Sequence, residues 1–106
     1  SDIIKSAGYK LSALEIEEVL SAHPAISEVA VVGAPSYEWG EIVTAFVVLR
    51  ESHELTLEEL RGWCADKLSP YKQPRRLDIL VSMPRNVMGK TQKNALRDHL
   101  SGEPVP

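Results

Sequence analysis

The stretch IVTAFVVL, residues 42–49, decides the fold because it is apolar on both of its alternating faces. A strand with one wet face alternates apolar and polar residues, whereas a strand covered on both faces is an almost continuous apolar run. We therefore expect residues 42–49 to form the central strand of a small sheet, with other elements covering both sides or nearly so.

Two further β-rich runs, residues 29–32 and 77–81, are expected to be the other strands of a three-stranded sheet. In the second run, apolar residues stand at the first, third and fifth positions, which predicts that these side chains point into the core. They are Leu77, Ile79 and Val81.

A small β-hairpin is expected ahead of this sheet. Residues 3–5 and 9–11 are short β-type runs, and the Ser-Ala-Gly between them ends on the residue type that turns most easily. The hairpin would therefore have Gly8 at its tip and Lys5 and Lys10 in its two arms.

Two helix starts share one sequence pattern. Residues 12–15 and 56–59 each place a hydroxyl residue three positions before a glutamate, which is typical of a capping box. The first helix is expected to end near His23, where a proline follows, and the second to run from about Leu57 to Leu68. The residues expected on the buried face of the first helix are Ala13, Ile16, Val19 and Leu20.

A third, shorter helix is expected after Thr91, with Gly102 just past its end as a natural stop. Its inward residues are predicted to be Ala95, Leu96 and Leu100. The fold class is then α+β: a small three-stranded sheet packed with about three helices and preceded by an N-terminal β-hairpin. Residues 1–102 are predicted to form this single domain, and residues 103–106 a loose tail.

The composition limits the class of protein. With 106 residues, of which 43% are hydrophobic, the chain can bury one modest core. There is neither an apolar run of 18 residues nor a signal-peptide pattern, so we expect a soluble protein that does not enter a membrane. The single cysteine, Cys64, is expected to be a buried hydrophobe, which fits a reducing compartment such as the cytoplasm or the mitochondrial matrix. The three histidines show no ligand spacing, and no metal site is predicted.

Charge is distributed unevenly along the chain. Residues 1–60 carry 3 Lys/Arg against 11 Asp/Glu, whereas residues 61–100 carry 9 against 3. A basic second half is either a solvated face or a surface that meets phosphates, and charge alone does not choose. A nucleic-acid-binding module is one alternative, although the exposed aromatic pairs of an RRM and the GXXG loop of a KH domain are missing. The residues expected on a basic face are Arg75, Arg76, Arg85, Lys93 and Arg97.

Three separated segments carry recognisable motifs. They are DIIKSAGYKLSALEIE (2–17), VVGAP (31–35) followed by GE (40–41), and YKQP (71–74) followed by PRNVMGK (84–90). In this order and at this spacing they resemble the C-terminal domain of the adenylate-forming enzymes, which are acyl- and aryl-CoA synthetases, nonribosomal-peptide adenylation domains and luciferases. Within that family the wording is most similar to malonyl-CoA synthetases.

The resemblance implies the mobile C-terminal lid of an ATP-dependent acid–CoA ligase. In such an enzyme, acid and ATP with Mg²⁺ give acyl-AMP and pyrophosphate, and coenzyme A then displaces AMP. A large N-terminal domain would be the partner and would hold most of the substrates, so the lid alone is expected to be inactive. A lid that loads a carrier-protein phosphopantetheine is a close alternative, and a bare interaction domain is a third. The family's hinge falls at Ser1 and Asp2, without the usual preceding Gly-Arg, so we expect the chain to begin at a domain boundary.

Lys90 is the candidate catalytic residue. Gly89-Lys90-Thr91 has the ending of a phosphate-binding P-loop, but Pro84 stands where that motif needs a glycine. The simplest interpretation is a surface lysine before a helix. The resemblance instead implies that Lys90 reaches the adenylate on a mobile loop and relieves the repulsion between carboxylate and α-phosphate oxygens.

The hairpin is the second candidate site. The resemblance implies that it enters the active site after the lid rotates, with Lys5 against the adenylate and with Gly8, Tyr9 and Lys10 along the coenzyme A channel. A glycine there lets a narrow thiol-bearing chain pass close to the backbone, and lysines suit phosphates. On residue types alone, the same segment is a turn with two lysines in water.

Overall fold

The computed structural model describes residues 2–100 of the chain. Gly102, Ser1 and the tail expected over residues 103–106 lie outside that range. The strands are β1 (Ile3–Ser6), β2 (Tyr9–Ser12), β3 (Ile26–Ser36), β4 (Gly40–Leu49) and β5 (Arg76–Ile79). The helices are α1 (Ala13–Leu20), α2 (Leu57–Cys64), α3 (Lys93–His99) and a 3₁₀ turn at Pro70–Lys72.

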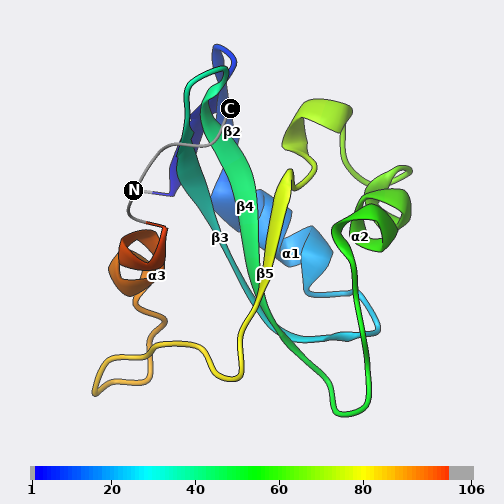
Figure 1. Cartoon of the computed structure of the whole chain (residues 1–106), viewed down its shortest axis with the longest axis vertical. Coiled ribbons are helices and arrows are strands. Elements are labelled where there is room, and N and C mark those ends of the chain that lie inside the picture. The colour runs from blue at the N-terminus through cyan, green and yellow to red at the C-terminus, as the bar shows by residue number, and fades with distance from the viewer. Residues whose placement is uncertain (1, 101–106) are drawn as a thin grey trace.

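The sheet is organised around β4. β3 pairs with it antiparallel over its whole length, and β5 pairs with it in parallel from Thr44 to Val47. The hairpin joins the same sheet, because β1 pairs with β4 where Ser6 faces Gly40, and the strand path runs β2-β1-β4-β3 (Figure 1). The three expected strands and the expected hairpin are thus parts of one five-stranded sheet.

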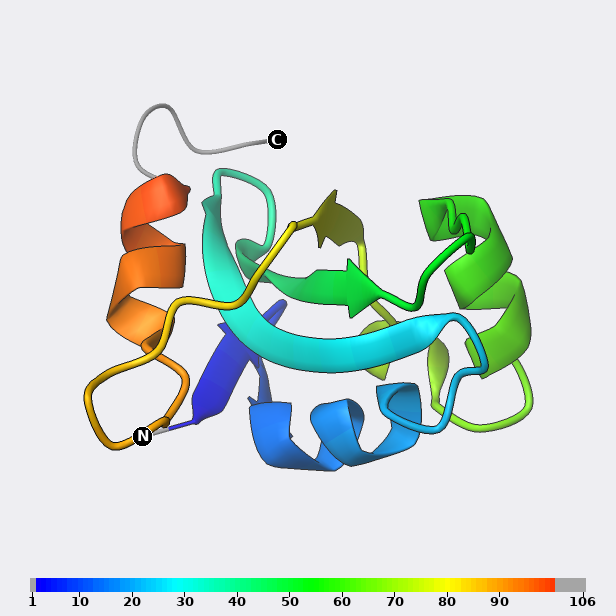
Figure 2. The same ribbon diagram turned by 90° about the horizontal axis from the view of Figure 1, so that it is seen from below.

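Both faces of β4 are buried, as its apolar run predicted. Val43, Ala45 and Val47 pack with α1 and α2 on one face, in the larger core cluster. Phe46 packs on the other face with Leu96 of α3 in a smaller cluster. The helices therefore lie on opposite sides of the sheet, α3 apart from α1 and α2 (Figure 2). Cys64 is fully buried in the larger cluster, as expected, and burial raises the pKa of its thiol.

The two helix starts differ in how they are capped. At α2 both halves of the capping box form, with Thr56 and Glu59 each accepting from the other's backbone N–H at 3.1 and 2.9 Å. At α1 the Ser12 hydroxyl accepts from the N–H of Glu15, but the Glu15 carboxylate pairs with Lys72 instead. Ser12 is also the last residue of β2, facing Ile3 in the hairpin, so it serves a strand and a helix together. Of the buried face predicted for α1, Ala13, Ile16 and Leu20 are buried, and Val19 is partly buried against the same cluster.

The ends of several elements differ from expectation. α1 ends at Leu20 and α2 at Cys64, each about one turn before the predicted end. β3 is much longer than residues 29–32, because its pairing with β4 continues to the turn between them. For α1 and α2, the proline in the sequence thus lies several residues past the end of the helix and not directly after it.

The inward alternation predicted for residues 77–81 is wrong beyond Leu77. The side chains of Ile79 and Val81 are 48% and 98% exposed. β5 is a short edge strand, and after it the chain crosses to the other face of the sheet, where Leu80 and Met83 join the smaller cluster. In α3, Leu96 and Leu100 pack inward as expected, whereas Ala95 is exposed.

Within residues 2–100, no helix is both long and apolar enough to cross a membrane. The longest helices have 8 residues, far short of the roughly 20 needed to span a bilayer.

His23 lies in the turn after α1 and holds that turn closed. Its Nδ1 accepts the backbone N–H of Ala25 at 3.0 Å, and its ring meets the edge of Trp63. Burial lowers the pKa of this imidazole, partly offset by Glu59. The neutral ring is therefore the form that the fold uses, since a protonated Nδ1 cannot accept.

We expect acid to loosen this turn. The folded-state pKa of His23 lies below its unfolded value, so the unfolded chain binds more protons and stability falls as pH drops below about 6.5. Thermal unfolding followed from pH 7.5 to 5.5 should show this fall, and His23→Gln should reduce its slope. His99→Gln is the matched control, since His99 is exposed, and an equal reduction there would contradict the assignment.

Candidate functional site

The lysine loop, residues 84–92, has an ordered neck. The N–H of Gln92 donates to the carbonyl of Pro84 at 2.8 Å, and Arg85 forms an isolated β-bridge with Thr91. The Arg85 guanidinium also donates to the carbonyl of Gly89 at 2.8 Å and pairs with Glu28 of β3. The loop is thus closed at its base and tied to the edge of the sheet.

Asn86 organises the tip of the lysine loop. Its side-chain oxygen accepts the backbone N–H of Met88 at 2.9 Å and of Lys90 at 3.0 Å. Its own backbone N–H donates to the carbonyl of Lys90, and Gly89 takes the positive φ of 85° that closes the turn. In the sequence, Asn86 is one position of the PRNVMGK motif, and no separate role is predicted for it. The signal for its role was an asparagine shortly before a glycine, a turn-forming combination.

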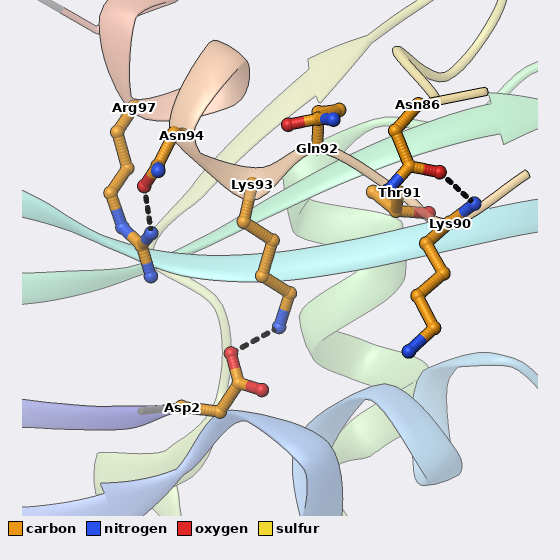
Figure 3. A pocket seen from close by; sticks show the side chains of 8 residues that line it. All are labelled: Asp2, Asn86, Lys90, Thr91, Gln92, Lys93, Asn94 and Arg97. Carbon is orange, nitrogen blue, oxygen red and sulfur yellow. Dashed lines mark hydrogen bonds and ion pairs between the residues drawn. The ribbon is translucent and has the colours of Figure 1, made fainter. Parts of the chain in front are cut away.

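Lys90 presents its ammonium outward from this fixed backbone. Its side chain lines a pocket of about 340 Å³ together with residues of the loop and α3 (Figure 3). No ion pair to Lys90 occurs within residues 2–100, where Lys67, Lys72 and Lys93 all have carboxylate partners. Lys90 therefore differs from these three lysines in having no carboxylate partner among the described residues.

The five residues expected on a basic face do not form a free positive surface. Arg76 pairs with Asp78 and Arg85 with Glu28, while Lys93 pairs with both Asp2 and Glu17. The other two are held by uncharged groups: the Arg75 guanidinium lies 3.9 Å from the ring centre of Trp39, and Arg97 donates to Asn94. The uneven charge along the sequence did not indicate most of these partners, because Glu28, Asp2 and Glu17 are distant in sequence from the basic residues they meet, and only Asp78 is a near neighbour.

The hairpin turn is tight and strained. Ala7 and Gly8 have φ of 49° and 86°, the pair of positive values found in a type I′ turn. The N–H of Ala7 donates to the carbonyl of Trp39 at 2.8 Å, which ties the tip to the turn between β3 and β4. The predicted glycine tip is thus confirmed, and a Cβ at Gly8 would have no heavy atom within 4 Å.

The three lysine and tyrosine side chains of the hairpin divide between its two faces. Lys5 and Lys10 are direct cross-strand partners and both are exposed, so their ammonium groups leave the same face. Tyr9 stacks on Tyr71 with ring centres 4.3 Å apart. Lys5 and Lys10 can therefore meet one anionic ligand together, while Tyr9 supports the hairpin from beside the 3₁₀ turn.

Glu41 supports the hairpin from the sheet, a role that sequence reasoning missed. Its carboxylate accepts the backbone N–H of Lys5 at 2.8 Å, one residue before Ser6, where β1 pairs with β4. The carboxylate lies over Gly33, where an added Cβ would be 2.7 Å from it. Gly33 and Glu41, both in the motif segments, thus act together: the glycine leaves room for the carboxylate, and the carboxylate holds the Lys5 backbone.

The two candidate sites are at different ends of the domain. In Figure 1 the tip of the hairpin is at the top, and the lysine loop is at the lower left, beyond α3. One rigid body therefore carries Lys90 on one end and the Lys5–Lys10 hairpin on the other.

The motifs and this geometry agree with comparisons to known proteins. The family model for the AMP-binding enzyme C-terminal domain matches residues 15–90. The chain belongs to this family, the C-terminal domains of adenylate-forming enzymes.

The individual relatives include malonate–CoA ligases. The human mitochondrial malonate–CoA ligase is 52% identical over 92% of this chain and 17% of the relative, and that of Arabidopsis thaliana 45% identical over 97% and 19%. Among solved structures, an acyl-CoA synthetase of Brucella canis has 38% identity and a TM-score of 0.88 over 94% of this chain and 19% of its own. Apo MatB of Rhodopseudomonas palustris has 33% identity and a TM-score of 0.89 over 93% and 20%. The chain thus spans about a fifth or less of the proteins it matches.

Asn86→Ala should loosen the lysine loop. It removes the acceptor of two backbone N–H groups, which we expect to cost about 1 kcal/mol in the free energy of unfolding. Hydrogen exchange at the amides of Met88 and Lys90 should become faster. Asn94→Ala is the control, because the Asn94 side chain accepts a hydrogen bond from the exposed Arg97 and not from the loop backbone; unchanged exchange in Asn86→Ala would contradict the described geometry.

Gly33→Ala should release the hairpin support. The new Cβ displaces the Glu41 carboxylate, and the Lys5 N–H loses its acceptor at a cost of about 1 kcal/mol. Gly62→Ala is the matched control, since Gly62 is in α2 with nothing within 4 Å of an added Cβ. That change should stabilise by roughly 0.5–1 kcal/mol. Chemical denaturation and exchange at the Lys5 amide distinguish the two, and equal effects would contradict the Gly33–Glu41 contact.

Proposed function

We propose that this chain is the lid domain of an ATP-dependent acid–CoA ligase, with malonate as the first acid to test. The observation that carries the proposal is the Lys90 ammonium, which has no ion pair within residues 2–100 and is held on a structured loop at one end of the domain. The other end carries Lys5 and Lys10, which face each other across the hairpin. Family membership and the names of the malonate–CoA ligase relatives support the choice of reaction. Most of the contacts to ATP, Mg²⁺ and coenzyme A would come from a large domain of a longer polypeptide. The relatives are themselves several times longer than this chain.

In the first half-reaction, Lys90 would stabilise the adenylation transition state. As the carboxylate attacks the α-phosphate and pyrophosphate leaves, negative charge gathers on the oxygens of both groups, and an ammonium placed between them lowers the barrier. The Asn86 bonds fix the Lys90 backbone beforehand, so little ordering is needed when the lid closes. Among the described residues, no acid pairs with the Lys90 ammonium, so no ion pair has to break before it meets the substrate.

In the second half-reaction, the lid would rotate and bring the hairpin to the adenylate. Lys5 would contact the adenylate, and Gly8, Tyr9 and Lys10 would line the path of coenzyme A, with Lys10 nearest its phosphates. The support from Glu41 and the tether at Ala7 hold the hairpin in shape during that movement. The thiol attacks the acyl carbonyl, AMP leaves, and the thioester forms.

Separate substitutions should disable the two halves. In the ligase that carries this chain, or in a fusion of this chain to the large domain of the human relative, Lys90→Ala should lower malonate-dependent pyrophosphate release by about 10²–10³-fold. It should still make thioester from supplied malonyl-adenylate. Gly8→Leu should release pyrophosphate normally but fail to convert the adenylate with coenzyme A.

Gly8→Ala is the control for Gly8→Leu. Any side chain at φ 86° costs backbone strain, but only leucine adds bulk to the space above the turn. We expect Gly8→Ala to keep most of the thioester step. If Lys90→Ala and Gly8→Leu both failed in the same half-reaction, the assignment of the two ends to two steps would be wrong.

A further inference from the structure

We propose that Lys93 is a positioning residue for Lys90, holding the base of the lysine loop to the first residues of the chain. This inference rests on the proposed function of Lys90. Lys93 lies three residues after Lys90 and begins α3. The sequence predicted Lys93 on a free basic face, but in the structure its ammonium is paired with two carboxylates.

The Lys93 ammonium is shared by two carboxylates. Its Nζ is 2.7 Å from Oδ1 of Asp2 and 2.6 Å from Oε2 of Glu17, and Figure 3 shows the side chain directed to Asp2. The side chains of Lys93 and Glu17 are only 17% and 19% exposed. Water screens such a pair less than a surface pair, so the ammonium is needed to hold two like charges side by side.

The same cluster connects four parts of the fold. The Oε2 of Glu17 also accepts the backbone N–H of Val31, on the edge strand β3, at 2.8 Å. The carbonyl of Asp2 accepts the N–H of Ala13 at the start of α1. Through Lys93, the first turn of α3 is therefore fixed to α1, β3 and the segment before β1.

Within residues 2–100, no other ion pair holds the first turn of α3. Its N-cap residue, Gln92, makes no side-chain capping bond. Of the apolar anchors of the helix, Leu96 lies at its middle and Leu100 directly after its last residue. Gln92 closes the neck of the lysine loop on Pro84, so a displaced first turn of α3 would move that neck and Lys90 with it.

The decisive experiment compares Lys93→Met with Lys93→Arg in the ligase that carries this chain. Methionine keeps the length of the side chain but leaves two carboxylates without their cation, whereas arginine can pair with both. We expect Lys93→Met to lower the rate of adenylation on the order of tenfold, because small misplacements of a catalytic group are costly. The thioester step from supplied acyl-adenylate should stay within about twofold, since the hairpin has its own supports. Lys93→Arg should restore most of the adenylation rate.

The controls separate positioning from general stability. Lys67→Met removes a lysine paired with the exposed Asp66, and it should leave both half-reactions unchanged. Faster hydrogen exchange at the Lys90 amide in Lys93→Met, but not in Lys67→Met, is expected. If Lys93→Met is insoluble, the double variant Asp2→Asn/Glu17→Gln removes both pairs while Lys93 remains. It should give the same selective loss of adenylation.

The possible failures are distinguishable. If Lys90→Ala loses adenylation while Lys93→Met or the double variant does not, the positioning role is wrong and the proposed function stands. An equal loss in both half-reactions would also overturn the positioning role, because it would indicate only a destabilised fold. If Lys90→Ala itself adenylates normally, the proposed function fails.

Discussion

The structure depends on the burial of β4 on both faces. A strand so placed must find cover on each side, and α1 with α2 supplies one layer while α3 supplies the other. The connection after β5 follows from the same need, since the chain must cross the sheet before it can form α3. That crossing leads directly into the lysine loop. The position of Lys90 is therefore a consequence of how the central strand is covered, and Phe46, which packs beside Leu96, links the core to the helix that follows the loop.

Lys90 and Lys93 are only three residues apart, but their ammonium groups have opposite surroundings. The first has no carboxylate partner within residues 2–100, and the second is held by Asp2 and Glu17. Paired charges fix backbone segments, whereas an unpaired one is available for chemistry but fixes nothing. The hairpin divides the same tasks: the Lys5 backbone is bound by Glu41, and its ammonium is left exposed. In both regions, hydrogen bonds or ion pairs fix the backbone, and a nearby ammonium group is left facing outward.

Local patterns in the sequence predicted most of the fold, and motifs predicted the two candidate sites. Apolar runs, capping residues and Gly8 act through neighbours a few positions away, so β4, α1, α2 and the hairpin could be anticipated. The failures involve partners that are distant along the chain. Lys93 meets Asp2 across 91 positions, and the Lys5 backbone meets Glu41 across 36. Ile79 and Val81 had the right alternation, but whether an edge strand continues depends on what lies beside it, which the alternation does not contain.

Trp39 occupies the junction between the hairpin and the rest of the sheet. Its carbonyl receives the Ala7 N–H from the strained tip, and its indole ring lies beneath the Arg75 guanidinium. Trp63, the other tryptophan, lies on α2, away from the hairpin, and contacts His23 and Lys67. A shift of the tip would thus change the surroundings of one indole and not the other. The fluorescence of Trp39 therefore reports a movement of the hairpin without an attached dye, and Trp63 serves as an internal reference.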